Sequence, residues 1–264
     1  MQTSEELHMS TNNRFFQATI GALIFLTTLA SAQSTSTPKA TYRFALNQDS
    51  FFGFNPTVNG AYRLNDRLDA TGYAVFWTTP SFGTGGGSGL WTEVGGGVNI
   101  RTFDGKWTFS PQLGILNGRL LSNGNFPMAF EGIVPNIVSN VNTSRAEGEF
   151  YMGRYTAVRT GRVPQAGRLV AAPNQNNFLH WWINGGYKLG SGVSVGLHYE
   201  HLGSNPSGTL PSASVYKWLG PYVQANFSSG FSLRFTTGAD VQSRTALDGQ
   251  GSFYKLTAAY TFSQ

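Results

Sequence analysis

Three side chains in the second half of the chain have the types and spacing that proton transfer requires: His180, His198 and Glu200. Side chains in an extended segment alternate between two faces, so His198 and Glu200 point the same way. A hairpin turning at 190–192 would place Glu200 beside Trp182 and diagonal to His180. A carboxylate next to imidazoles can perform acid–base chemistry or bind a metal ion.

The rest of the sequence gives this group little catalytic support. The chain contains no G-x-S-x-G and no H-E-x-x-H motif, and no spacing nominates a Ser or Asp partner. His201 has the wrong parity to join the group. We therefore expect His180, His198 and Glu200 to form a hydrogen-bonded polar site, with no catalytic residue, no cofactor and no metal. A lipid- or peptide-cleaving enzyme remains the alternative.

The segments that carry these residues alternate between apolar and polar positions. In the first of them, Val58 and Tyr62 fall on one face, whereas Asn59 and Arg63 fall on the other. This pattern predicts a strand with one apolar and one polar face. It recurs in ten segments: 54–64, 67–77, 90–101, 106–117, 146–158, 177–189, 193–203, 215–227, 231–241 and 252–262.

The connections between these segments alternate between short and long. Tight turns are expected at 65–66, 104–105, 190–192 and 228–230. Long loops are expected at 78–89, 118–145, 204–213 and 242–251. Transmembrane barrels have short turns at one end, longer loops at the other and an even number of strands. Ten strands alone give the wrong polarity, and adding Thr41–Asn47 and a weaker strand at Arg162–Ala172 gives twelve. We predict an all-β, antiparallel, up-and-down transmembrane β-barrel of about twelve strands, with ten or fourteen as alternatives.

The composition agrees with a surface that faces lipid. Only 12% of the 264 residues are charged, about half of the usual ~25%. The formal net charge is +5, but no run of Lys or Arg indicates nucleic-acid binding. The chain has no cysteine, which excludes disulfides and thiolate metal sites. The expected partners are outer-membrane lipid and small solutes, and the oligomeric state stays open.

The N-terminus predicts export. An apolar run at 15–30 follows Arg14, and Ala30-Ser31-Ala32 fits a signal-peptidase site. We expect residues 1–32 to be a signal peptide, with Met9 as a possible true start. Residues 33–264 would then form one barrel domain, located in the bacterial outer membrane.

The inward faces of the predicted strands carry two groups of charges. Cations near the tight turns predict a basic ring at one end of the lumen: Arg43, Arg63, Arg67, Arg101, Lys106, Lys188 and Arg234. Carboxylates near the long loops predict an acidic mouth at the other end: Glu93, Glu147, Glu149, Glu200 and Asp240. These charges could form a graded pore field that favours anions, or they could pair across the lumen and close it.

Two further features bear on the ends of the barrel. The loop 118–145 is too apolar for a solvated tip, so it folds into the lumen or packs on the rim or on a partner. Aromatic residues at strand ends, Trp77, Trp107 and Trp181 among them, are expected to form interfacial girdles.

The central part of the chain resembles a family of uncharacterised bacterial outer-membrane barrel proteins known only as a domain of unknown function. The matching segments are LWTEVGGGVN, PQLGILNG, FEGIVPN, GEFYMGRY, NFLHWWINGGYK and LHYEHL, which span most of Leu90–Leu202. The resemblance implies a porin-like barrel and its location, and no activity. We interpret the sequence as a narrow porin-like passive channel for small solutes with a mild anion preference. A barrel enzyme and a non-conducting structural or adhesion barrel are the alternatives.

Overall fold

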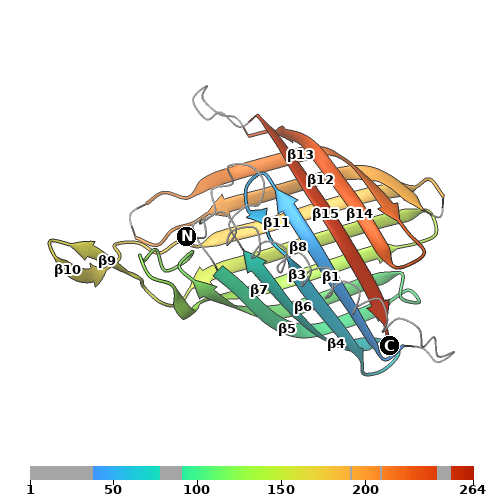
Figure 1. Ribbon diagram of the computed structural model, residues 1–264, viewed down its shortest axis with the longest axis horizontal. Helices are drawn as coiled ribbons and strands as arrows, with labels where there is room; N and C mark the ends of the chain where they lie inside the picture. Colours follow the sequence, from blue (N-terminus) through green and yellow to red (C-terminus); the bar gives the residue numbers. More distant parts are fainter. Residues whose placement is uncertain (1–37, 78–90, 191, 209, 243–250) are drawn as a thin grey trace, which may run out of the picture.

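The chain folds into a closed antiparallel β-barrel, shown as a computed structural model in Figure 1. The structure describes residues 38–77, 91–190, 192–208, 210–242 and 251–264. The predicted signal peptide lies outside these residues. The strands are β1 (Ala40–Asp49), β2 (Gly53–Phe54), β3 (Thr57–Arg63), β4 (Leu68–Trp77), β5 (Trp91–Thr102), β6 (Trp107–Gly118), β7 (Met128–Asn142), β8 (Ala146–Ala157), β9 (Arg162–Gln165), β10 (Arg168–Ala171), β11 (Phe178–Lys188), β12 (Val193–Ser204), β13 (Ala213–Asn226), β14 (Phe231–Asp240) and β15 (Ser252–Ser263).

Twelve strands form the barrel wall, as the sequence predicts. Each wall strand pairs with its neighbours in chain order, and β1 pairs with both β3 and β15, which closes the sheet. The two-residue strand β2 pairs with the end of β1 and is not counted as a wall strand. The tight turns lie at the right of Figure 1, which we call the turn end, and the opposite end is the loop end. Closure leaves no unpaired sheet edge in the wall.

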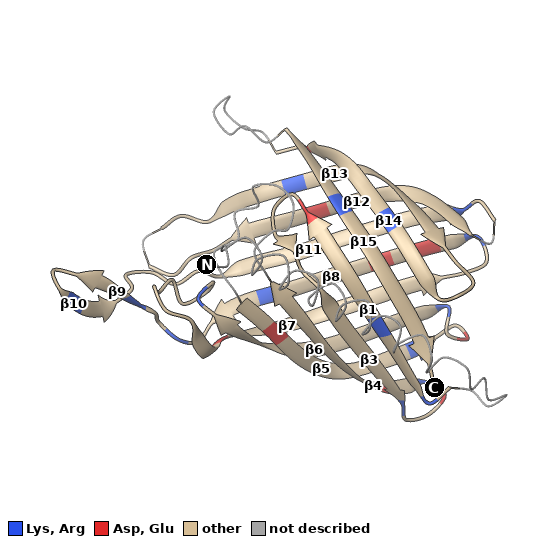
Figure 2. Cartoon of the chain, viewed as in Figure 1, with Lys and Arg blue, Asp and Glu red and all other residues tan. Residues whose placement is uncertain are grey.

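The two faces of the wall are sorted as the alternation predicts. On the outside, Leu64, Leu113 and Leu197 are 54%, 55% and 62% exposed. On the inside, polar residues such as Asn136 and Ser194 are buried. Figure 2 shows that charged residues occupy few positions along the strands. An apolar outer band with a polar interior is the arrangement of barrels that span lipid. The described residues include no helix that is both long and apolar enough to cross a membrane.

The twelfth strand is not the one that the sequence predicts. Residues 162–172, expected in the wall, form a separate hairpin of β9 and β10 that projects from the loop end. The wall instead includes β7, which lies within the predicted loop 118–145 and is followed by a tight turn at 143–145. Val134 and Val138 face inward in β7, so the contrast between its two faces is weak. Pro135 also favours the prediction of a loop, because proline is rare inside a central strand.

Glycines on the inner wall make room for two tyrosine rings. A Cβ on Gly95 would lie 2.5 Å from the ring of Tyr73, and a Cβ on Gly196 would lie 2.5 Å from the ring of Tyr222. Both rings can therefore lie flat against the wall, because nothing but backbone stands beneath them. Each tyrosine hydroxyl reaches a carboxylate in the lumen.

Candidate functional site

The candidate site is the lumen, which begins at the turn end as a wide cavity. This cavity has a volume of about 1050 Å³ and is lined by Lys39, Arg63, Arg67 and Arg101 together with Asp66, Asp69 and Asp104. Asp69 binds Arg101 through two hydrogen bonds, one of them Nε to Oδ2 at 3.0 Å. Lys106 is exposed on the turn and does not line the cavity. Arg63, Arg67 and Arg101 of the predicted basic ring lie here, and the ring as predicted included neither Lys39 nor the three aspartates.

A second cavity of about 710 Å³ continues toward the middle of the barrel. Arg234 donates from Nη1 to Oε2 of Glu149 at 2.9 Å, and Arg43 on β1 lines the same cavity. Tyr222 and Ser194 both donate to Glu147, at 2.9 Å each. Lys188 lies at the turn end of this cavity and donates to the carbonyl of Thr143 at 2.7 Å.

The predicted acidic mouth is wrong for Glu147 and Glu149. The sequence placed them next to a long loop, but β8 begins directly after the tight turn 143–145. Both carboxylates therefore lie in the turn-end half of the lumen, among the predicted basic ring. The error follows from the missed strand β7, because an omitted strand reverses the direction of the next one.

The predicted polar site does assemble, in a third cavity of about 300 Å³ nearer the loop end. Glu200 pairs with Trp182 across β11 and β12, as expected. The Nε2 of His180 lies 2.8 Å from Oε1 of Glu200, and the Nε2 of His198 lies 3.0 Å from Oε2. Lys255 also contacts Oε2, and the hydroxyl of Tyr216 donates to Oε1 at 2.7 Å.

This arrangement uses both carboxylate oxygens of Glu200, which is fully buried. Lys255 and Tyr216 are the members that the sequence did not place in the site. Tyr216 comes from β13, which pairs with β12, and Lys255 comes from β15, three strands from β12 in the curved wall. No group of three or more His, Asp or Glu side chains in the described ranges is arranged to hold a metal ion.

The two remaining residues of the predicted mouth do lie toward the loop end. Glu93 is 1% exposed, and its Oε1 accepts a hydrogen bond from the hydroxyl of Tyr73 at 2.7 Å. Asp240 accepts the backbone N–H groups of Lys217 at 3.1 Å and Gln242 at 3.0 Å. Neither forms an open, charged entrance.

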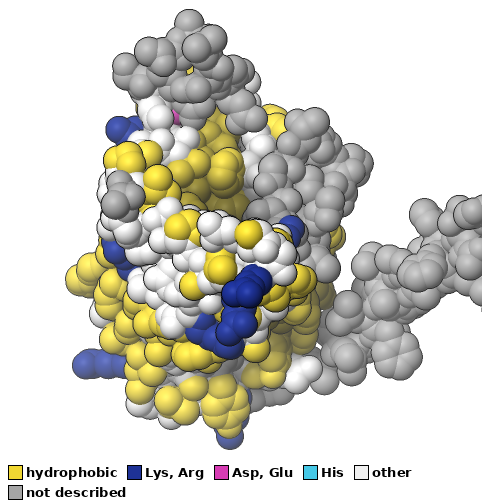
Figure 3. Space-filling model, turned by 90° about the vertical axis from the view of Figure 1, so that its left-hand side faces the viewer, with side chains coloured by type: hydrophobic (Ala, Val, Ile, Leu, Met, Phe, Trp, Pro, Cys, Tyr) yellow, Lys and Arg dark blue, Asp and Glu magenta, His cyan; other side chains and the backbone are white. Residues whose placement is uncertain are grey.

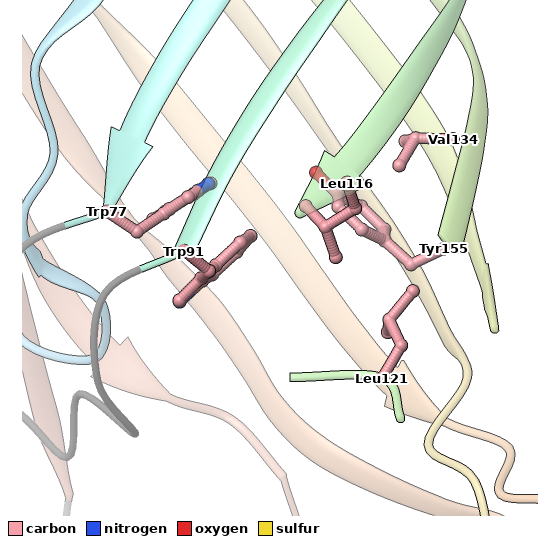
Figure 4. Close-up of a cluster of buried hydrophobic side chains, with 6 residues drawn as sticks. All are labelled: Trp77, Trp91, Leu116, Leu121, Val134 and Tyr155. Atoms are coloured by element: carbon pink, nitrogen blue, oxygen red, sulfur yellow. The ribbon is translucent and has the colours of Figure 1, made fainter. Parts of the chain in front are cut away.

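Above the third cavity, a run of aromatic rings crosses the lumen. It leads from Trp91 on β5 through Trp77, Phe52, Phe51, Tyr216 and Trp218 to Phe253 on β15. Successive ring centroids are 4.2, 4.6, 5.0, 5.1, 4.0 and 4.7 Å apart. Leu116, Leu121, Val134 and Tyr155 belong to the same buried cluster as Trp77 and Trp91 (Figure 4). We call these eleven residues the aromatic partition. Trp77 is thus a lumen residue, and its predicted place in the outer girdle is wrong.

Two inward-folded segments supply the centre of the aromatic partition, and a buried carboxylate fixes each of them. Asp49 accepts the backbone N–H groups of Phe51 at 2.9 Å and Phe52 at 2.6 Å. Glu131 accepts those of Leu120 at 3.0 Å, Leu121 at 3.1 Å and Ser122 at 3.0 Å. The expectation that part of 118–145 folds into the lumen is therefore confirmed for Leu120–Ser122. Each carboxylate satisfies N–H groups that no strand pairs.

The chain belongs to a family of unknown function (DUF6733). The family model matches residues 9–262. This agrees with the resemblance noted from the sequence. Among curated proteins, none matches the chain.

Several solved structures are similar at low sequence identity. The outer membrane channel COG4313 from Pseudomonas putida F1 has 12% identity and a TM-score of 0.49, over 88% of this chain and 98% of that one. NanC porin has 9% identity and a TM-score of 0.47, over 84% and 99%. KdgM porin, in a complex with disordered oligogalacturonate, has 8% identity and a TM-score of 0.44, over 84% and 99%.

Proposed function

We propose that this protein is an exported outer-membrane barrel that acts as a narrow, porin-like channel for small solutes. The observation that carries the proposal is the series of three cavities, of about 1050, 710 and 300 Å³, inside a closed wall with an apolar outer surface. Adjoining cavities share lining residues: Thr41 and Asn99 line the first and second, and Arg43 and Arg234 line the second and third. Polar side chains thus line the path of a solute from the turn end to the aromatic partition.

The aromatic partition sets the expected conductance. Its rings are in contact across the lumen, so they narrow the path of a solute at this level. The segments Phe51–Phe52 and Leu120–Ser122 are fixed by side-chain acceptors rather than by strand pairing, which makes them the parts most easily displaced. We expect a low unitary conductance with infrequent openings.

A mild anion preference follows from the charges at the turn end. Lys39, Arg63, Arg67 and Arg101 outnumber Asp66, Asp69 and Asp104 in the first cavity. The excess in this cavity is one positive charge, and the ion pairs Asp69–Arg101 and Glu149–Arg234 weaken the field of the charges that they join. Cations that line an aqueous pore raise the local concentration of anions. The preference is therefore expected to be modest.

The His180–His198–Glu200 group acts in this proposal as a structural crosslink between wall strands. Both oxygens of Glu200 are engaged by neighbouring side chains, which leaves no acceptor for a substrate proton. The barrel-enzyme alternative would need one of these contacts to open. Hydrolysis of phospholipid or peptide by purified barrel, lost in His180→Gln, would support that alternative.

Recording currents in planar lipid bilayers tests the channel. Wild-type protein should give small discrete steps, and Phe51→Gly/Phe52→Gly should increase the open probability or the step size. Phe235→Ala is the matched control, since Phe235 is exposed on the outer surface and 45% accessible. If neither wild type nor the double glycine variant conducts while both are folded, the channel proposal is wrong and a non-conducting barrel is favoured.

A further inference from the structure

One sector of the barrel, formed by β8, β11, β12 and β13, carries basic side chains at the loop-end edge of its apolar band, Arg154 on β8 and Lys217 on β13. Ile183, which is 50% exposed, marks the apolar band on β11, and Trp181 is the next outward residue toward the loop end. Trp181 pairs with Met152 on one side and with His201 on the other, and His201 pairs with Lys217. Arg154 is exposed, one outward position beyond Met152.

This order is that of a membrane interface. The ring of Trp181 lies 5.1 Å from that of Tyr199 and 6.0 Å from that of His201, so an aromatic group ends the apolar band. Aromatic rings favour the depth of lipid headgroups, and basic side chains just beyond them reach the phosphates. Arg154 occupies this second level, and Lys217 is in register with His201 at the level of the aromatic group.

The β9–β10 hairpin continues the same sector outward, because it connects β8 to β11. It adds exposed Arg162 and Arg168, and exposed Arg159 precedes it. The base of the hairpin is fixed to the neighbouring loop: Asn125 donates its N–H to the carbonyl of Arg162 at 3.0 Å, and Gly161 donates to that of Ser122 at 2.7 Å. The arginines are thus carried by an anchored element.

The described part of the loop end has no exposed carboxylate to balance these charges. Asp49, Glu93, Glu131 and Glu200 are buried, and Asp240 is half-buried on backbone N–H groups. In Figure 2 the hairpin carries Lys or Arg and no Asp or Glu, and Figure 3 shows basic side chains gathered near the centre of this end. The turn end differs, because exposed Asp66 and Asp104 lie among its cations.

We propose that Arg154, Arg159, Arg162, Arg168 and Lys217, the basic sector, bind the phosphate groups of lipid headgroups in the leaflet that surrounds the loop end. The proposal rests on the outer-membrane location given above, and it does not require conduction. Charge complementarity selects the occupant. Arg154 lies beyond an aromatic group on the wall that faces lipid, and the hairpin arginines beside it have no balancing carboxylate, so headgroup phosphates are the anions that match this sector.

The test is the binding of diphosphorylated lipid A to the folded barrel in a non-ionic detergent, measured by native mass spectrometry. Dephosphorylated lipid A and inorganic phosphate are the comparison ligands. We expect the diphosphorylated lipid to bind most tightly, with an affinity that falls as salt is raised. Arg162→Gln/Arg168→Gln should weaken binding by about thirtyfold, from about fivefold for each arginine near a membrane surface.

The matched control is Lys106→Gln/Arg145→Gln, which removes the same charge from exposed positions at the turn end. It should bind the lipid as wild type does. Heat-modifiable migration on gels establishes that each variant is folded. The proposal is overturned if the two double variants lose affinity for diphosphorylated lipid A to the same extent. It is also overturned if dephosphorylated lipid A or inorganic phosphate binds wild-type protein as tightly as diphosphorylated lipid A does. A barrel that binds the lipid but does not conduct would support the lipid-binding proposal and contradict only the channel proposal.

Discussion

The two ends of the lumen differ in how they treat charge. At the turn end, Arg63, Arg67 and Asp66 line a wide cavity. At the loop end, Asp49, Glu131 and Glu200 are buried, and each makes at least two hydrogen bonds or ion pairs. A carboxylate in water contributes mainly to the field in the pore, whereas a buried carboxylate must be fully paired and so determines structure. In the proposed channel, charge at the turn end tunes the passage of ions, and charge at the loop end holds the aromatic partition in place.

The largest expected difference between the ends concerns stability. Glu200→Gln leaves Lys255 without its carboxylate partner in a site where the Glu200 side chain has 0% exposure and that of Lys255 has 24%. Removing one member of a buried ion pair costs about 3–5 kcal/mol, and the partial exposure of Lys255 favours the lower figure. Glu149→Gln is the counterpart, because its pair with Arg234 is 31% and 25% exposed. It should cost at most about 1 kcal/mol. Urea unfolding of the barrel in lipid vesicles measures both, and equal costs would mean that burial does not separate the two ends.

A smaller effect is expected for the carboxylate that fixes Leu120–Ser122. Glu131→Gln keeps one acceptor oxygen and places an amide donor against backbone N–H groups, so at least one of those groups loses its partner. An unpaired buried donor costs about 1–3 kcal/mol. The amides of Leu120–Ser122 should exchange faster with deuterium, and the channel should open more often. Asp104→Asn, on an exposed turn, should change stability by less than about 0.5 kcal/mol. Unchanged exchange at Leu120–Ser122 in Glu131→Gln would show that the segment is retained by packing alone.

The smallest effect is expected on ion selectivity. Arg63→Gln/Arg67→Gln removes two cations from the first cavity, and reversal potentials in asymmetric KCl should shift away from anion preference. Lys106→Gln should shift them less, because Lys106 does not line that cavity. Both shifts should shrink as salt is raised, over a Debye length of about 10 Å at 0.1 M. Cation preference in wild type would contradict the proposed role of the turn-end charges.

The sequence by itself determined the wall. Alternation along each strand fixed which residues face outward, and the Asp104-Gly105 turn and its counterparts fixed which end carries the tight turns. These are local properties, because the period of a strand and the chemistry of a turn are read within a few residues. Where the local contrast was weak, at β7 with its inward Val134 and Val138, the prediction failed, and Glu147 and Glu149 were assigned to the wrong end.

Only the tertiary structure decided which side chains meet inside the lumen. The sequence brought His180 to Glu200 because one hairpin joins them, but Lys255 lies on β15, three strands from β12, and reaches Glu200 because the sheet curves around the lumen. The aromatic partition likewise joins rings from β5 and β15 through Phe51 and Phe52. No periodicity marks those two residues, because they lie in a short connection whose direction is set by the carboxylate of Asp49. Contacts across a lumen depend on closure and tilt of the whole sheet, which no local pattern contains.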